Sequence, residues 1–309
     1  MTLAAQAGLP QISAQPGVDW FDDERVMLAQ GALNALVIHA SPRVALTLAR
    51  QGIEHGVHVW MTPPIGRSFS DATETIRRAR DLGAILWVSS WWRHVREDVR
   101  AILDREEGRR LHLCEVRSSA AGPGIDSWWA SAAEGGGGVL RHTAYELLEA
   151  LIALRGLPES LFATVGRCRT RASQTPRETE DIAVSVLRYE NGGAATIHAT
   201  WDIEPFESML RGHAPDKAFE LTTAAVRLAT VDGASDVIRD LPGDRLAADL
   251  AKFVREVRGG RASDETRAAV EHHASVSALL ESIYLSSRTG QPESPRQLFE
   301  AQGWSETRR

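Results

Sequence analysis

Between residues 35 and 89, short apolar runs alternate with longer amphipathic segments, and this pattern constrains the fold more than any other feature. The apolar runs are residues 35–40, 57–61 and 84–89, each short enough for a buried strand. The segments between them, residues 43–55 and 71–82, carry apolar groups at helical spacing. Strands that alternate with helices of this length are typical of βαβ units, so this part of the chain is predicted to form a parallel sheet.

Beyond residue 111 the pattern changes to strand-like segments, several of them joined by turn signals such as Asn191-Gly192 and Asp232-Gly233. The strand-like segments are residues 111–116, 161–168, 182–189, 194–200, 219–222 and 226–230, and the final helices are expected at residues 246–258 and 268–287. The expected fold class is α/β plus α+β. A truncated Rossmann-like parallel sheet over residues 1–90 precedes a mainly antiparallel sheet domain over residues 91–309, with helices on one face. Residues 1–19 are expected to hold a helix remnant and a loop.

Four stretches resemble a known family of oxidoreductases. Residues 35–66 read as a strand ending in His-Ala-Ser-Pro, a helix, and a strand that runs into Pro63-Pro64. The other stretches are a glycine run with its helix, a hairpin and a closing helix, at residues 135–149, 181–201 and 281–290. Their order and spacing resemble the glucose–fructose oxidoreductase/inositol dehydrogenase (Gfo/Idh/MocA) family over residues 18–292. The resemblance implies a Rossmann domain, NAD(P)-dependent chemistry on sugar- or cyclitol-like substrates, and dimers formed through the C-terminal sheet.

The chain departs from that family at its catalytic positions. The resemblance places the family's catalytic lysine at Pro63 and the preceding glutamate at Thr62. It places the aspartate and histidine of the later helix at His142 and Glu146, and the arginine of a Trp-Arg pair at Trp129. Proline cannot replace a lysine in any protonation state because it has no side-chain donor. We therefore expect a degenerate family member that has lost NAD(P)-dependent redox activity.

The glycine run from Gly135 to Gly138 is the candidate phosphate-binding segment. A dinucleotide fingerprint follows a buried strand and precedes an acidic residue about 20 positions later, and the context after Glu134 meets neither condition. The run is expected instead to let a loop pass close to the sheet. The family's opening Gly-x-Gly-x-x-Gly turn has no counterpart in the sequence, so no cofactor is expected. A gene start assigned too late would restore that turn, and NAD(P) would then be the cofactor.

His142 and Glu146 are the candidate catalytic residues. Their i,i+4 spacing places both on one face of a helix, and Glu149 continues that face. An imidazole and a carboxylate at this place could serve as base and orienter, or as two ligands of a divalent metal. No third ligand is evident, so no metal is predicted. The alternative is an ordinary polar contact.

The candidate substrate-binding residues are four tryptophans and a histidine: Trp91, Trp92, Trp128, Trp129 and His198. By the resemblance, both tryptophan pairs come from loops over the substrate cleft, and the histidine lies on a strand that faces it, near Trp201. Indoles stack on sugar rings and can donate one hydrogen bond. Packing between the two domains is the alternative role.

Composition excludes several classes of function. The net charge of −6 and the pI of about 6.0 argue against a nucleic-acid partner, which usually needs a basic face. No stretch approaches the roughly 18 apolar residues of a membrane span, so no membrane association is expected. The two cysteines, Cys114 and Cys168, indicate a reducing cytoplasm. We expect a cytoplasmic homodimer that binds, or acts non-oxidatively on, a small sugar- or cyclitol-like molecule. A working oxidoreductase with a mis-assigned start and a non-catalytic partner subunit are the alternatives.

Overall fold

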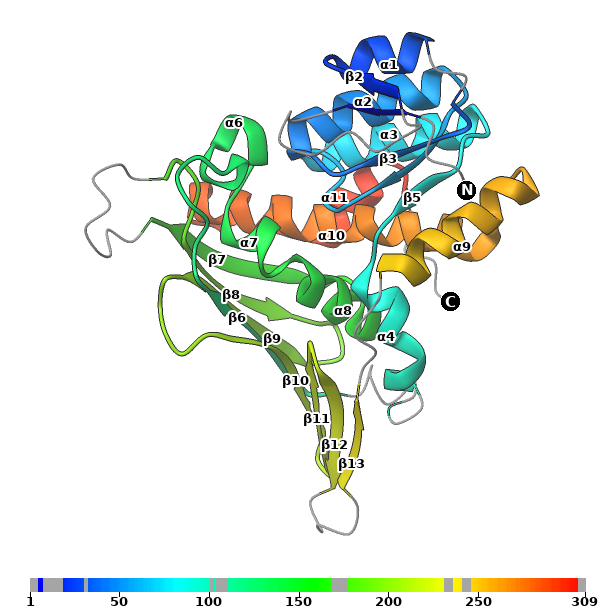
Figure 1. The fold of residues 1–309 in the computed structure, drawn as a ribbon. Coiled ribbons are helices and arrows are strands. Elements are labelled where there is room, and N and C mark those ends of the chain that lie inside the picture. Colours follow the sequence, from blue (N-terminus) through cyan, green and yellow to red (C-terminus); the bar gives the residue numbers. More distant parts are fainter. Residues whose placement is uncertain are drawn as a thin grey trace.

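The described residues form a two-stranded, a three-stranded and an eight-stranded sheet, with helices packed between and around the two larger ones (Figure 1). The computed structural model describes residues 5–7, 19–30, 33–100, 103, 111–167, 177–230, 236–240 and 246–304. Cys168 and the turn expected at Asp232-Gly233 lie outside these residues. The expected fold class is confirmed: a small parallel sheet comes first, and a larger, mostly antiparallel sheet follows.

The small sheet consists of β3 (Ala35–Ile38), β4 (His58–Met61) and β5 (Leu86–Val88), which are all parallel and lie in that order. The helices α2 (Pro42–Glu54) and α3 (Phe69–Asp81) follow β3 and β4. Each of these helices begins at a serine cap, Ser41 or Ser68, whose hydroxyl accepts a hydrogen bond from the backbone N–H three residues later. The βαβ pattern read from the sequence is therefore present.

The N-terminal prediction was wrong in one respect. Ala5–Ala7 forms a short strand, β1, which pairs in parallel with β2 (Asp19–Phe21), so this stretch is not a helix remnant. The helix α1 (Glu24–Gln30) follows directly. Alanine and glutamine have low strand propensity, so strand pairing with a distant segment decided the conformation here.

The large sheet has eight strands in the order β13-β12-β11-β10-β6-β9-β8-β7, and every neighbouring pair is antiparallel except β6 with β9. The strands are β6 (Leu113–Ala120), β7 (Ser160–Gly166), β8 (Ile182–Arg188), β9 (Ala194–Trp201), β10 (Glu207–His213), β11 (Lys217–Thr222), β12 (Ala225–Thr230) and β13 (Asp236–Asp240). The sequence analysis predicted neither β13 nor β10, and β10 has no β-branched residue. A Cβ on Gly212 of β10 would lie 2.6 Å from Leu111 Cδ1, so the strand's close fit, more than its propensity, favours a glycine there.

Helices cover one face of the large sheet. The main ones are α8 (Tyr145–Arg155) and α10 (Asp264–Thr289), and α10 runs between the two sheets (Figure 1). The hydroxyls of Ser286 and Ser287 on α10 accept the N–H groups of Ala163 and Val165, which ties this helix to the edge strand β7. The remaining helices are α4 (Trp91–Arg100), η1 (Trp128–Ala130), α6 (Ala132–Gly135), α7 (Val139–His142), α9 (Leu246–Gly259) and α11 (Pro295–Ala301).

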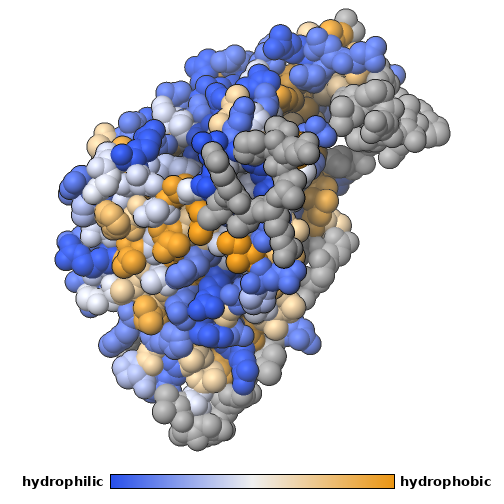
Figure 2. All heavy atoms as spheres, turned by 90° about the vertical axis from the view of Figure 1, so that its left-hand side faces the viewer, coloured by the Kyte–Doolittle hydropathy of each residue, from blue (hydrophilic) through white to orange (hydrophobic). Residues whose placement is uncertain are grey.

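The other face of the large sheet is open. Phe162 on β7 and Val184 and Val186 on β8 point outward from it, with exposed fractions of 49%, 38% and 55%. The side of the molecule that faces left in Figure 1 carries hydrophobic surface beside polar surface (Figure 2). Inward-facing residues of the same strands, such as Ala183 and Leu187, are fully buried. The strict alternation follows from the two-residue period of a strand.

The helix α9 packs on the small sheet, although it comes from the far end of the chain. Trp60 of β4 and Ile85 and Trp87 beside it form a buried cluster with Phe253 of α9. Alternate residues of the same strands, such as Val59, belong to the main core, which runs from the small sheet through to the large one. The boundary near residue 90 stays a prediction, since both parts share that core. Among the described residues, no helix is long and apolar enough to cross a membrane.

A buried carboxylate fixes α9 to the sheet. Asp249 accepts the indole N–H groups of Trp60 and Trp87 at 2.8 and 2.9 Å, and Arg93 donates to it at 3.2 Å. His94 Nε2 lies 3.1 Å from the same carboxylate. Burial alone would raise the pKa of Asp249, but these partners outweigh burial and hold the pKa below its ordinary value. The carboxylate is therefore ionised and satisfied inside the protein.

Replacing Asp249 by alanine should strongly destabilise the folded protein, because two indole donors and the Arg93 guanidinium would then lie buried without their acceptor. The expected loss is about 3–5 kcal/mol of unfolding free energy, measured by urea denaturation. Asp81→Ala is the control, since that carboxylate is 68% exposed and should change stability by no more than about 0.5 kcal/mol. Equal effects of the two substitutions would contradict the structural role of Asp249.

Candidate functional site

Four rings, defined here as the aromatic group, come together from segments far apart in the sequence: Trp128, Trp129, His142 and Trp201. The imidazole of His142 stacks on Trp129 with ring centres 4.9 Å apart and meets Trp201 edge-on at 5.8 Å. Trp128 makes an edge contact at 5.8 Å with His39, the residue directly after β3. The group therefore spans from the carboxyl end of the small parallel sheet to the inner face of the large one. Ligands of open α/β sheets bind at that end of the strands.

Hydrogen bonds hold the indoles in place. The backbone carbonyl of Trp129 accepts the Thr179 hydroxyl at 2.6 Å, and the indole N–H of Trp201 donates to the Thr143 hydroxyl at 3.1 Å. Trp201 is buried, whereas Trp128 and Trp129 stay partly accessible. The indole N–H of Trp128 has no hydrogen-bond partner in the part of the chain that the structure describes. A ligand oxygen beside it would satisfy that donor.

His142 is accessible at the surface of the aromatic group. Partial desolvation of its ring among the indoles lowers the pKa of His142 below the ordinary value. The imidazole is therefore neutral at pH 7, and a neutral imidazole can accept a proton. His142 can therefore act as a base, the role that the sequence analysis suggested for it.

His142 and Glu146 do not share one continuous helix, so that premise of the sequence reading was wrong. The helix α7 ends at His142, and Glu146 lies in the first turn of α8. The backbone N–H groups of Thr143 and Ala144 both bond to the Val139 carbonyl at 3.0 Å, which makes an i→i−5 turn between the helices. Glu146 is exposed. The break between α7 and α8 changes the rotation between His142 and Glu146, and their i,i+4 spacing in the sequence does not reveal this change.

The glycine run packs too closely for any side chain. A Cβ on Gly137 would lie 2.2 Å from the Tyr284 hydroxyl, and one on Gly138 would lie 2.1 Å from the Glu180 carbonyl oxygen. The N–H groups of Gly138 and Leu140 donate to the Glu180 carboxylate at 2.7 and 3.2 Å, and Tyr284 donates to it at 2.8 Å. The protein's own carboxylate thus takes the place at the start of α7 that a phosphate would need. This close packing is what the sequence reading expected of the run.

A second carboxylate joins the segment before the glycine run to the small sheet. Glu134 accepts the Ser41 hydroxyl at 2.6 Å and the Arg43 guanidinium at 2.7 Å, both at the start of α2. The hydrogen bond from Ser41, followed by that from Arg43, outweighs burial and lowers the pKa of Glu134. Arg67, in the loop after β4, donates to the Ala133 carbonyl at 2.7 Å. These bonds position η1 and the indoles it carries.

The loop after β4 contains Thr62 and Pro63 at the positions that the resemblance assigned to glutamate and lysine. The Thr62 N–H bonds to the Ile38 carbonyl at 3.3 Å, and the Pro63-Pro64 peptide bond is cis. The chain's lysines, Lys217 and Lys252, lie on β11 and α9. Neither contributes to the aromatic group.

Trp91 and Trp92 begin α4, so the prediction that they lie in a loop was wrong. Trp91 is 5% exposed and belongs to the main core, against which Trp92 packs. Beneath them, Glu149 accepts the hydroxyl of Ser90, which caps the start of α4, and the backbone N–H of Trp92. Glu149 Oε2 has no hydrogen-bond partner among the described residues. Burial raises the pKa of Glu149 to about 8.

His198 lies on the open face of the large sheet. It is opposite Val184 on the neighbouring strand β8 and exposed, whereas the inward-facing Trp201 belongs to the aromatic group. The two residues are three positions apart on one strand, so they point to opposite faces of the sheet. The structure therefore does not bring His198 together with the tryptophans. Within the described ranges, no group of three His, Cys, Asp or Glu side chains could hold a metal ion.

Sequence reasoning did not single out His39 or Glu180. His39 directly follows a predicted parallel strand, and that position is itself a usable signal for a site. Glu180 gave no local signal, because its role depends on the approach of a glycine run 42 residues earlier in the chain.

Comparisons with known proteins agree with this architecture. Residues 74–213 match the model of the GFO/IDH/MocA C-terminal domain. No curated protein sequence matches the chain. Among solved structures, an aldose-aldose oxidoreductase from Caulobacter crescentus in complex with glycerol has a TM-score of 0.77 at 18% identity, covering 95% of this chain and 91% of the other.

Two further solved structures share the fold. A levoglucosan dehydrogenase in complex with NADH and levoglucosan has a TM-score of 0.73 at 14% identity, covering 94% of this chain and 90% of the other. The WlbA dehydrogenase from Bordetella pertussis, in complex with NADH and UDP-GlcNAcA, has a TM-score of 0.68 at 23% identity, covering 90% of this chain and 84% of the other. At these identities the likeness establishes the fold.

Glu149→Gln should remove a pH-dependent loss of stability. With a folded pKa of about 8 against an ordinary value of 4.5, the carboxyl stays protonated in the folded protein while it ionises in the unfolded chain. Stability from this group is therefore full below pH 4.5 and is lost as the pH rises toward 8. Glutamine does not ionise, so the variant should gain at least about 1.4 kcal/mol over the parent between pH 5 and pH 8.

The measurement is urea denaturation of both proteins at intervals of pH. Glu300→Gln, an exposed change on the distant helix α11, should show no such trend. A constant difference between Glu149→Gln and the parent at every pH would contradict the raised pKa.

Proposed function

We propose that this protein belongs to the Gfo/Idh/MocA family, as the domain match and the shared fold support, and that it binds a small sugar- or cyclitol-like molecule at the aromatic group. The stacked pair of Trp129 and His142, at the carboxyl end of the small sheet, is the observation that carries the proposal. Indole faces pack against the C–H faces of sugar rings, and His142 and the Trp128 N–H supply polar partners for hydroxyl groups. Solved structures with the same fold hold glycerol, levoglucosan and a UDP-sugar.

We propose further that any chemistry at this site is non-oxidative. Pro63 offers no donor at the position of the family's lysine, and no lysine approaches from another element. The N–H groups of Gly138 and Leu140, at the start of α7, already donate to Glu180, so this segment does not fit a dinucleotide phosphate. Neutral His142 is then the base for a proton transfer. An NAD(P)-dependent oxidoreductase is the second candidate, favoured by the NADH in two structures of the same fold.

Binding to the aromatic group can be tested with glucose, myo-inositol and levoglucosan by calorimetry. At least one should bind saturably, and Trp129→Ala should weaken that binding about tenfold, because loss of a stacking face removes roughly 1–1.5 kcal/mol. Trp304→Ala is the control, since that indole packs on Phe299 and makes no contact with the aromatic group. No saturable binding, or equal weakening by both substitutions, would refute the proposed site.

The non-oxidative assignment has its own measurement. Protein mixed with the bound sugar and with NAD or NADP should produce no reduced nicotinamide absorbance at any pH between 6 and 9. Formation of NADH or NADPH that is lost in His142→Ala would instead support the NAD(P)-dependent oxidoreductase. That result would contradict the non-oxidative assignment even if sugar binding were confirmed.

We also propose that the open face of the large sheet forms a homodimer. Phe162, Val184 and Val186 supply exposed apolar side chains on adjacent strands there. Val186→Glu would place a charge in that interface and should convert the dimer to a monomer in sedimentation equilibrium at micromolar concentration. Val37→Glu, at a 46% exposed valine on the small sheet, should leave the dimer intact. A monomeric parent protein would end this proposal.

A further inference from the structure

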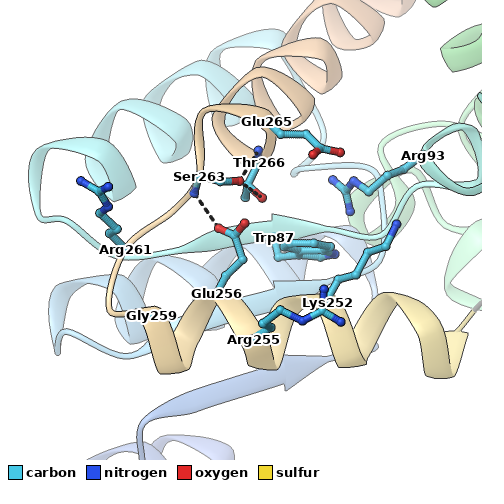
Figure 3. A pocket seen from close by; sticks show the side chains of 10 residues that line it. All are labelled: Trp87, Arg93, Lys252, Arg255, Glu256, Gly259, Arg261, Ser263, Glu265 and Thr266. Carbon is cyan, nitrogen blue, oxygen red and sulfur yellow. Dashed lines mark hydrogen bonds between the residues drawn. The ribbon is translucent and has the colours of Figure 1, made fainter.

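A second candidate site lies away from the aromatic group, between α9 and the start of α10. It is a pocket of about 400 Å³ whose floor includes Trp87 of β5 (Figure 3). Arg93 of α4 lines one end of the pocket, and Lys252 and Arg255 of α9 line its side. Arg261, on the loop that leads to α10, also lines the pocket. In Figure 3 Lys252 extends from α9 toward Arg93, and Arg255 lies beside it. Four cations from three elements thus surround one cavity in a protein of net charge −6.

The two acidic residues of the pocket are already engaged. Glu256 accepts the backbone N–H of Ser263 at 2.6 Å, and Glu265 pairs with Arg96 on α4. The side chains of Lys252 and Arg255, by contrast, make no hydrogen bond or ion pair within the described part of the chain, and the same holds for the side chain of Arg261. The lining therefore has an excess of unpaired positive charge.

Arg93 is the most unusual of the four cations. Its side chain is 3% exposed, and its guanidinium lies 4.2 Å from the centre of the Trp87 ring. One terminal nitrogen donates to Asp249, but the other has no partner among the described residues. A buried donor without an acceptor costs about 1–3 kcal/mol, and hydrogen bonds to a charged group are the strongest way to recover it. This orphan donor lies in the wall of the cationic pocket.

We propose that this pocket binds a small multivalent phosphate, of the diphosphate or phosphorylated-metabolite class. Cations that approach from separate elements match the several oxygens of a tetrahedral phosphate better than the two coplanar oxygens of a carboxylate. A volume of about 400 Å³ accommodates such a compound. The ligand would give the second nitrogen of Arg93 an acceptor and neutralise Lys252 and Arg255.

This site is independent of the proposed sugar site. Trp87 faces α9 on the side of the small sheet that carries Trp60, whereas the aromatic group lies at the carboxyl end of the strands. Loss of sugar binding would therefore leave phosphate binding untouched. Trp129→Ala should bind phosphate as the parent does.

The test uses sodium pyrophosphate as the probe, with EDTA present, in calorimetry on the full chain at constant ionic strength. Constant salt is needed because screening changes every surface charge interaction. Arg255→Gln should weaken pyrophosphate binding about tenfold, the equivalent of one lost charge-assisted contact. Arg258→Gln is the matched control: it lies on the same helix, is exposed, and does not line the pocket. It should change affinity less than twofold.

Three outcomes would overturn the proposal. They are no saturable pyrophosphate binding by the parent, equal weakening by Arg255→Gln and Arg258→Gln, and citrate binding as tightly as pyrophosphate. Selective loss with Arg255→Gln, together with a preference for pyrophosphate over citrate, would support it. Arg255 is exposed, so its substitution leaves the core intact, and an unchanged melting temperature without ligand verifies this.

Discussion

The carboxylate of Asp249 is the interaction on which the arrangement of the protein depends. It lies on α9, near the end of the chain, and receives donors from β4, β5 and α4, which come from the first hundred residues. Without it, Trp60 and Trp87 would bury indole N–H groups that have no acceptor, and Arg93 would carry an uncompensated charge. The same bonds set the position of α9, and through it the floor and one wall of the cationic pocket.

Carboxylates at helix starts recur elsewhere in the protein. Glu134 lies at the start of α2, Glu149 at the start of α4 and Glu180 at the start of α7. Their environments differ, because hydrogen bonds from Ser41 and Arg43 lower the pKa of Glu134, whereas burial raises the pKa of Glu149 and Glu180. A helix start favours negative charge or a hydrogen-bond acceptor, and at each of these three starts a carboxyl group of the protein is the acceptor, Glu149 in its neutral form below about pH 8. The segments around the aromatic group are therefore fixed internally and need no bound anion.

The periodicity of the sequence was enough to predict the strands β3, β4 and β5 and most of the large sheet, because buried parallel strands and half-exposed antiparallel strands each leave a clear apolar pattern. It was not enough for β10, where pairing overrode a weak local preference, or for the i→i−5 turn that separates His142 from Glu146. The tryptophans show the same division. The family resemblance singled them out, but only packing placed Trp91 in the core and Trp129 against His142.

What the sequence by itself determined is the set of groups at each position, and with it the chemistry that is possible. Pro63 cannot donate a proton or a hydrogen bond in any fold, and Gly138 leaves room for a close approach that every other residue would block. Only the tertiary structure decided which groups meet. The contacts of Asp249 with Trp60, of Glu180 with Gly138 and of Trp129 with His142 join residues 189, 42 and 13 positions apart. Local propensity acts over a few residues, so contacts at such separations are set by the packing of whole elements.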